Sequence, residues 1–147
     1  MSREVRRFTD LDVWREAHQL FVDLYADLEL VHQDPGAETI AAQLMRSTGS
    51  VSANIAEGFN RSQKRFVNSL DIALGEANEA ESWLYKLRDV GLVDGEIARS
   101  RLKTVIHVQR MLTSLKTKIA ANPNCVREAP AVYDAGEAGA PFLTIDD

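Results

Sequence analysis

The stretch "FVNSLDIALGEANEAESWLYKL", residues 66–87, decides the fold, because its apolar residues recur with the period of a helix. The spacing alternates between four and three residues along one seam, formed by Phe66, Leu70, Ala73, Ala77, Ala80, Leu84 and Leu87. Three alanines in the middle of the seam leave room for a neighbouring helix to approach closely. The stretch therefore predicts an amphipathic helix packed closely against another helix.

Three further segments show the same periodicity, within residues 10–31, 37–59 and 97–121. Their seams run through Trp14, Ala17, Phe21, Leu24, Leu28 and Val31, then Ile40, Leu44, Thr48, Val51 and Ile55, then Leu102, Val105, Val108, Leu112, Leu115 and Ile119. We expect Thr9 to cap the first helix, with Asp12 three residues later. Short connections join the segments, so the sequence predicts an all-α protein, an antiparallel up-down four-helix bundle over residues 1–121.

Composition places the acidity at the C-terminal end of the chain. The 147 residues carry a formal charge of −5 with 45% hydrophobic residues. Residues 122–147 hold five acids against one base, whereas residues 1–121 hold 16 bases and 17 acids. We therefore expect a nearly neutral helical body and a flexible acidic tail over residues 122–147. The basic N-terminus lacks the apolar segment of a secretory signal, and no apolar run reaches the ~20 residues of a membrane span, so we expect a cytoplasmic protein.

Three segments resemble a known family: "FTDLDVWREAHQL" (residues 8–20), "LMRSTGSVSANIAEGFNR" (44–61) and "FVNSLDIALGEANEAESWL" (66–84). The chain resembles the bacterial four-helix-bundle proteins encoded in intervening sequences of 23S ribosomal RNA genes, also labelled S23 ribosomal proteins. The resemblance covers residues 8–120 and is carried most specifically by Phe8, Asp10, Leu11, Val13, Trp14 and the segment 54–58.

This resemblance implies a bundle that assembles into a ring, typically a homopentamer, and it implies no established catalytic activity. A related fold is the accessory protein of diversity-generating retroelements, a basic pentameric barrel that binds a reverse transcriptase and nucleic acid. The nearly neutral body of this chain departs from that relative in charge.

Motifs for metal binding and catalysis are incomplete in this sequence. Di-iron bundles need a Glu-x-x-His pair on each of two helices, and only Glu29 with His32 has that spacing. The single cysteine, Cys125, excludes an internal disulfide and a multi-cysteine metal site. No Gly-x-Ser-x-Gly elbow and no glycine-rich phosphate loop occurs. We therefore expect a protein without cofactors that is not an enzyme.

The second helical segment carries a face that permits several interpretations. Arg46, Ser50, Ala53, Glu57 and Arg61 share this face, opposite the apolar seam, with Asn54 at its boundary. It is either a solvated face, with Glu57 and Arg61 as an i,i+4 pair, or a helix-packing or subunit contact across which Asn54 and Glu57 form hydrogen bonds. Catalysis by Glu57 is a third alternative.

Trp83 lies off the alanine seam of the third segment. It is either core from a second side or an interface anchor, because tryptophan is enriched in binding hot spots. Together with the small-residue face of the second segment, this second populated face exceeds what one bundle can easily bury. We therefore expect a homo-oligomer.

The fourth segment carries a basic stripe formed by Arg99, Lys103, His107 and Arg110. Residues 94–121 hold six bases against two acids. The stripe is either an ordinary solvated face or a surface for nucleic-acid phosphates, whose binding would depend steeply on salt.

The tail ends in "APFLTIDD", residues 140–147, where Phe142, Leu143 and Ile145 adjoin two acids. These apolar residues either have no role or dock into a groove of a partner or of this chain. For the whole protein, the first hypothesis is an oligomeric scaffold or adaptor that binds a protein or ribonucleoprotein. The alternative is a ring that binds RNA or DNA directly, as an accessory to a reverse transcriptase.

Overall fold

The computed structural model describes residues 4–29, 31 and 34–124. A short 3₁₀ helix, η1 (Phe8–Asp10), precedes four α-helices: α1 (Asp12–Leu28), α2 (Pro35–Gly58), α3 (Gln63–Asp89) and α4 (Gly95–Ala121). No strand occurs among the described residues, so the predicted all-α bundle is confirmed. Residues 125–147, with the predicted docking residues Phe142, Leu143 and Ile145, lie outside the described residues.

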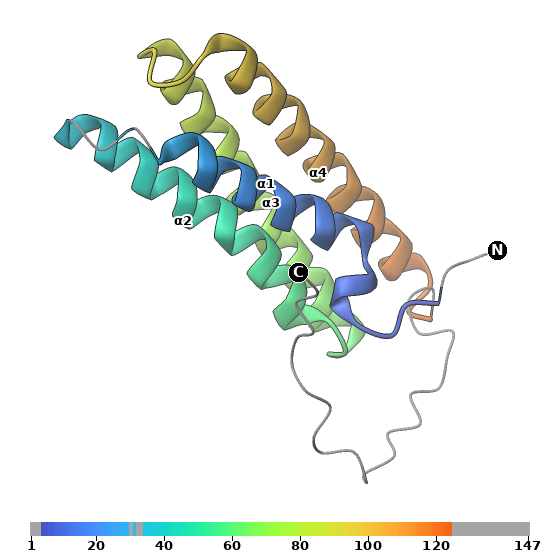
Figure 1. Ribbon diagram of the computed structural model, residues 1–147. Coiled ribbons are helices and arrows are strands. Elements are labelled where there is room, and N and C mark those ends of the chain that lie inside the picture. Colours follow the sequence, from blue (N-terminus) through green and yellow to red (C-terminus); the bar gives the residue numbers. More distant parts are fainter. Residues whose placement is uncertain (1–3, 30, 32–33, 125–147) are drawn as a thin grey trace, which may run out of the picture.

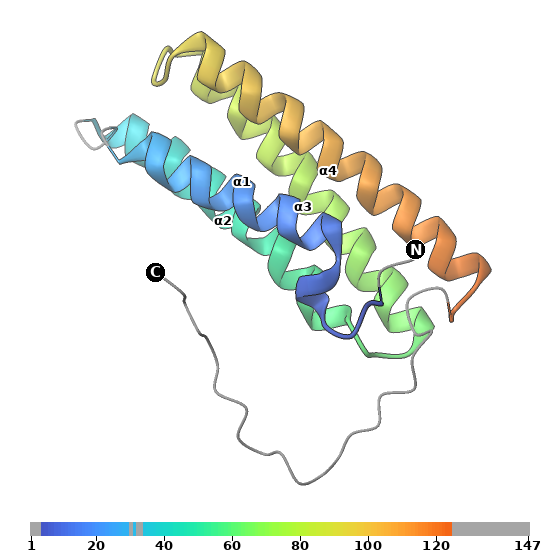
Figure 2. The same cartoon turned by 45° about the vertical axis from the view of Figure 1, so that its right-hand side comes forward.

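The helices are arranged as two layers, α1 with α2 and α3 with α4 (Figure 2). Inter-helix contacts join α1 to α2, α2 to α3, α3 to α4 and α4 to α1. The end of α1, the start of α2 and the α3–α4 turn lie at one end of the bundle, and the α2–α3 turn lies at the other (Figure 1). We call these the loop end and the η1 end.

The predicted seam of α3 forms the centre of the core. Its seven residues are all buried, and Leu70, Ala73, Ala77, Ala80 and Leu84 are inaccessible to solvent. The core of α1 differs from the prediction by one position: Val13 and Leu20 are buried, whereas Trp14 and Phe21 are half-buried. The ring of Phe21 lies against α2, where Gly49 makes room: a β-carbon added there would lie 3.1 Å from Cε2 of Phe21.

The start of α1 corrects the predicted cap. Residue Thr9 is part of η1, and the N-cap position of α1 is Leu11, which has no side-chain cap hydrogen bond. The carboxylate of Asp10 instead accepts hydrogen bonds from the backbone amides of Arg6 and Arg7, 3.0 and 2.9 Å long. This satisfies donors at the start of η1 and turns the chain before α1 begins.

Side chains cap the other three helices. Asp34, Ser62 and Asp94 accept hydrogen bonds from the first-turn amides of α2, α3 and α4. Pro35 occupies the first position of α2, two residues earlier than predicted, because its missing N–H is not needed there. Gly91 has a φ of +72°, a left-handed conformation that ends α3 and favours glycine.

Candidate binding surfaces on the helical bundle

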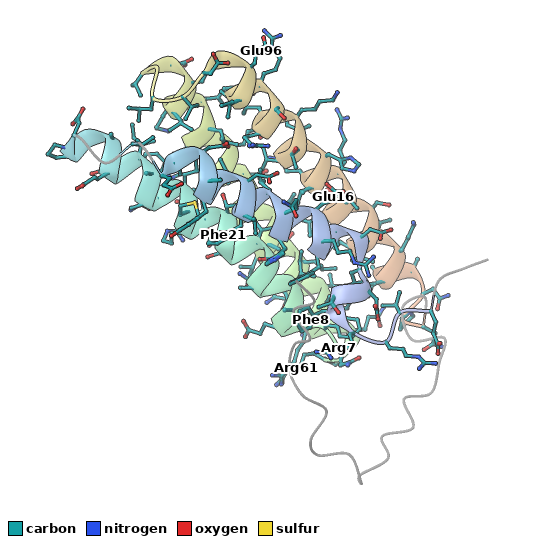
Figure 3. The ribbon with its side chains drawn as sticks, in the orientation of Figure 1. Arg7, Phe8, Glu16, Phe21, Arg61 and Glu96 are labelled. Atoms are coloured by element: carbon teal, nitrogen blue, oxygen red, sulfur yellow. The ribbon has the colours of Figure 1, made fainter. Side chains whose placement is uncertain are left out.

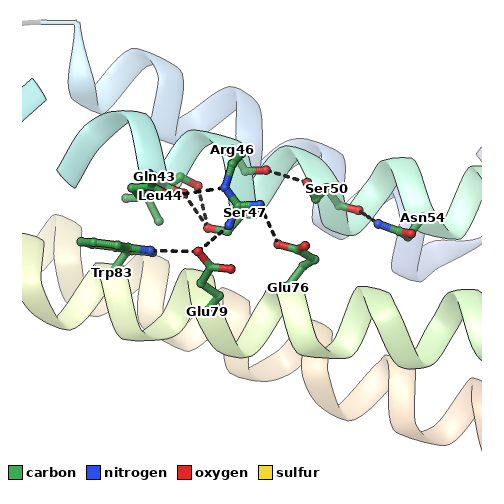
Figure 4. Close-up of polar contacts among 9 residues, drawn as sticks. All are labelled: Gln43, Leu44, Arg46, Ser47, Ser50, Asn54, Glu76, Glu79 and Trp83. Carbon is green, nitrogen blue, oxygen red and sulfur yellow. Dashed lines mark hydrogen bonds and ion pairs between the residues drawn. The ribbon is translucent and has the colours of Figure 1, made fainter. Parts of the chain in front are cut away.

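A polar network connects α2 and α3 on one side of the bundle (Figure 4). The guanidinium of Arg46 pairs with Glu79, and with the Oε2 atom of Glu76 at 3.4 Å. The indole Nε1 of Trp83 donates to Glu79 Oε1 over 3.2 Å. Hydrogen bonds from Arg46, and then from Trp83, hold the pKa of Glu79 below its ordinary value. The carboxylate therefore stays ionised and fixes the half-buried indole ring on the surface.

The predicted small-residue face of α2 lies along the same side. The Ser50 hydroxyl donates to the carbonyl of Arg46 over 2.9 Å, and Asn54 Nδ2 donates to the carbonyl of Ser50 over 2.7 Å (Figure 4). The Asn54 amide thus bonds within its own helix. Ala53 and Glu57 are exposed. We refer to Ser50, Ala53, Asn54, Glu57, Arg61 and Trp83 as the α2–α3 face.

Close packing of α2 on α3 comes from other small residues. The side chain of Ser47 is fully buried, and its hydroxyl donates to backbone carbonyls of α2. Gly58 lies against α3, where a β-carbon at its position would stand 2.5 Å from Cβ of Ser69. Residues 47 and 58 therefore let the helices approach, which leaves Ser50 and Ala53 directed outward.

A polar groove of about 620 Å³ continues the α2–α3 face at the η1 end. Asn54, Glu57 and Arg61 line one side, while Arg65, Asn68 and Ile72 of α3 line the other. Figure 3 shows Arg61 at this end of the molecule. The side chain of Ile72 is 46% exposed, which adds an apolar wall to a groove rich in hydrogen-bonding groups. Such a mixture suits contact with a macromolecule.

The basic stripe of α4 is fully displayed on the surface. Arg99, Lys103, His107 and Arg110 are all exposed. Arg99 pairs with Glu96 over 3.2 Å, and both side chains are 78% exposed, so this pair is weak. Figure 3 shows Glu96 at the loop end, where the stripe begins. The four side chains form a row along one outer face of α4.

A further surface, which the sequence analysis missed, lies where α1 and α2 meet at the loop end. An apolar groove of about 350 Å³ is bounded by Tyr25, Leu28, Glu29, Glu38, Ala41, Ala42 and Met45. The side chain of Tyr25 is 69% exposed, and that of Val22 on the same helix is 44% exposed. Tyr25 lies one helical turn after the half-buried Phe21. The sequence signal that could have revealed this groove is therefore the row of aromatic residues along α1.

An aromatic cluster extends this row toward the η1 end. The rings of Trp14 and His18 stack with centroids 4.8 Å apart, and Phe8 meets Trp14 edge-on at 5.2 Å. Trp14 is therefore half-buried: it packs against the edge of the core and carries the exposed His18 ring on its face.

The described part of the chain has neither a metal-ligand cluster nor a membrane-spanning helix. Within residues 4–29, 31 and 34–124, no group of three or more His, Cys, Asp or Glu side chains is placed to hold a metal ion. None of the helices in this part of the chain has the length and apolar content needed to cross a membrane.

Comparison with known proteins identifies relatives for this bundle. A solved structure from Bacteroides thetaiotaomicron VPI-5482, described as a protein of unknown function from the S23 ribosomal protein family, shares the fold with a TM-score of 0.66. The two chains are 28% identical, and the match covers 71% of this chain and 97% of the other. No curated protein matches the chain significantly. The family model of the 23S rRNA-intervening sequence proteins matches residues 9–114. The chain therefore belongs to the 23S rRNA-intervening sequence protein family.

Proposed function

We propose that the protein is a non-enzymatic, self-associating scaffold that presents its α2–α3 face to a protein or ribonucleoprotein partner. The observation that carries this proposal is the fixed indole of Trp83. Its Nε1 is bonded to Glu79, which Arg46 holds in turn. A half-buried tryptophan ordered before contact loses little side-chain entropy on binding, which suits an interface anchor.

The rest of the α2–α3 face supports the same role. Ser50 and Ala53 continue this face along α2, from the Arg46–Glu79–Trp83 contact toward the polar groove, which supplies amide and guanidinium donors at the η1 end. These features provide contact area and hydrogen bonding, which are the properties of an adaptor surface. The ring of five subunits implied by the family resemblance stays a prediction.

Ala53→Arg tests the α2–α3 face directly. Ala53 is exposed, so a bulky cation there leaves the core intact and obstructs only an incoming surface. A tagged, natively expressed protein should co-purify with a defined partner, and A53R should lose it. Gln19→Arg, an exposed change on α1, serves as the matched control and should retain the partner. A partner retained equally by both variants would contradict the proposed face.

The sequence-based prediction that Ala53 lies at a subunit contact is tested in the same experiment. If A53R lowers the mass of the assembly, the α2–α3 face joins subunits. If the mass is unchanged while the partner is lost, the face serves the partner.

A second function, direct binding of RNA or DNA, is favoured by the exposed stripe Arg99, Lys103, His107 and Arg110. A row of cations along one helix suits phosphate contacts, whose affinity falls steeply with salt. A gel shift that weakens with salt and disappears in Arg99→Glu/Lys103→Glu would support it. Lys64→Glu/Arg65→Glu, an equal charge change at the η1 end, serves as the control. Absence of a shift at low salt would exclude this function.

A further inference from the structure

A second apolar groove lies between α3 and α4 at the η1 end, where α4 ends. It measures about 640 Å³, and Val67 of α3 with Ala120 and Ala121 of α4 gives it a mainly apolar lining. The last residue of α4, Ala121, therefore forms part of the groove wall (Figure 1). The C-terminal segment of the chain starts beside this α3–α4 groove.

The side-chain amide of Gln63 joins the two helices at the α3–α4 groove. Its Nε2 atom donates to the carbonyl oxygens of Ile119 and Ala120 over 2.9 and 3.1 Å. Carbonyls in the last turn of a helix lack partners within that helix, so this side chain satisfies two of them. The bonds fix the first turn of α3 against the last turn of α4, and the groove is formed before any occupant enters it.

Cations outnumber acids along the α3–α4 groove and the polar groove of the α2–α3 face. Lys64 and Asn68 line both grooves, so the two adjoin. Lys116 pairs with Asp71 over 2.8 Å, and the Asp71 side chain is 62% exposed, so this pair is weak. The charged residues that line the two grooves are Arg61, Lys64, Arg65 and Lys116 against Glu57 and Asp71. This balance favours an occupant with negative charge.

The end of this chain has the matching chemistry. Residues 140–147 read "APFLTIDD", in which the apolar Phe142, Leu143 and Ile145 precede two aspartates, Asp146 and Asp147. In a short segment of this kind, apolar side chains can enter a groove lined by small apolar residues while the carboxylates meet the cations at its border.

The length of chain after α4 selects this groove over the α1–α2 groove. Fifteen residues, 125–139, separate the described part of the chain from residues 140–147. A random coil of that length spans about 20 Å on average. The 27 residues of α4 extend about 40 Å toward the loop end, where the α1–α2 groove lies. Glu29 and Glu38 also line that groove, and their carboxylates would repel the two aspartates.

We propose that the α3–α4 groove is the docking site of residues 140–147 of the same chain, with their apolar side chains against its lining and their aspartates beside Lys64 and Lys116. The short connection gives the segment an effective concentration on the order of millimolar. At micromolar protein, the segment therefore outcompetes the same segment of a separate molecule. The docking does not depend on the proposed scaffold function.

Disulfide trapping in the full-length chain tests this docking. Cys125→Ser removes the native thiol, Thr144→Cys places one in the segment, and Thr117→Cys places the other in the groove, which Thr117 lines. In the control pair, Lys118→Cys replaces Thr117→Cys, because Lys118 is exposed on α4 and does not line the groove. Under mild oxidation at micromolar concentration, the groove pair should form its intramolecular disulfide several-fold faster than the control pair.

Two changes to the groove pair test the chemistry of the contact. Phe142→Ser/Leu143→Ser removes apolar side chains and should lower the rate to that of the control pair. Lys64→Glu should also lower it, and Asp146→Lys in the same chain should restore part of the rate. Lys64, Thr117 and Lys118 are exposed, so circular dichroism should show native helix content.

Three results would overturn the proposal. Equal rates for the groove pair and the control pair would show that the segment does not prefer the groove. A rate that Phe142→Ser/Leu143→Ser or Lys64→Glu leaves unchanged would contradict the apolar or the charged contact. Disulfides that join two molecules, at a rate that rises with protein concentration, would contradict docking within the same chain.

Discussion

Gly58 of α2 lies so close to the side chain of Ser69 on α3 that no side chain fits at position 58. A β-carbon at Gly58 would lie 2.5 Å from Cβ and 2.7 Å from Oγ of Ser69, and 3.0 Å from Cδ2 of Phe66. Real β-carbons do not approach other atoms to 2.5 Å, so the α2–α3 distance at the η1 end depends on this glycine.

Gly58→Ala should therefore destabilise the protein, because the added methyl must push α2 and α3 apart. Overpacking of this kind costs about 1–3 kcal/mol in the free energy of unfolding. Urea denaturation measures it. Ser69→Gly in the same chain removes the opposing Cβ and should restore part of the loss, whereas equal stability of G58A and the wild type would contradict the close contact.

The ion pair between α1 and α4 should contribute to stability more than the exposed pairs do. Arg101 Nε lies 2.6 Å from Asp27 Oδ2, and the two side chains are 21% and 11% exposed. Arg101→Met leaves the Asp27 carboxylate poorly solvated, which should cost about 2–3 kcal/mol of unfolding free energy.

Replacing both partners should cost less than replacing one. Arg101→Met/Asp27→Leu removes the unpaired charge and keeps apolar volume, so its urea midpoint should lie above that of R101M alone. Equal urea midpoints for the single and double variants would contradict this, because they would mean that the unpaired Asp27 carboxylate does not destabilise the fold.

Protonation of Glu79 at acidic pH should weaken its hydrogen bond with Trp83 and let the indole ring move. Hydrogen bonds from Arg46 and Trp83 lower the pKa of Glu79 from 4.5, so the ionised form is favoured in the folded protein. A carboxyl group with a lowered pKa stabilises the fold above its unfolded pKa and loses that effect as the pH falls through its folded pKa. The change at Trp83 should therefore occur below pH 4.5.

Fluorescence of the Trp14→Phe variant, which leaves Trp83 as the only tryptophan, measures this transition. The emission maximum should shift as Glu79 is protonated. Glu79→Gln should remove the transition while the helix content stays the same. A transition of identical midpoint in E79Q would assign it to another group.

Periodicity predicted the helices and the α3 seam because burial in a bundle follows directly from spacing along one helix. It placed Trp14 and Phe21 in the core, where the structure has Val13 and Leu20, because the orientation of α1 depends on Gly49 of a different helix. A helical wheel of one segment contains no information about the space that its neighbour leaves.

The sequence also could not predict which side chains form ion pairs between different helices. Arg101 and Asp27 are 74 positions apart, and Arg46 and Glu79 are 33 apart, and no local pattern connects either pair. The sequence left Trp83 open between core and interface, and the structure has it half-buried against the core, whereas the residues of the basic stripe are exposed. The groove at Tyr25 could not be predicted from one segment because residues of both α1 and α2 line it.

The most direct test of the whole account is the mass of the wild-type protein in solution. Light scattering after size-exclusion chromatography, at micromolar concentration and low salt, reports this mass without any variant or partner. A self-associating scaffold should elute as a single species whose mass is a multiple of 16.3 kDa. A species of 16.3 kDa across the concentration range would contradict self-association.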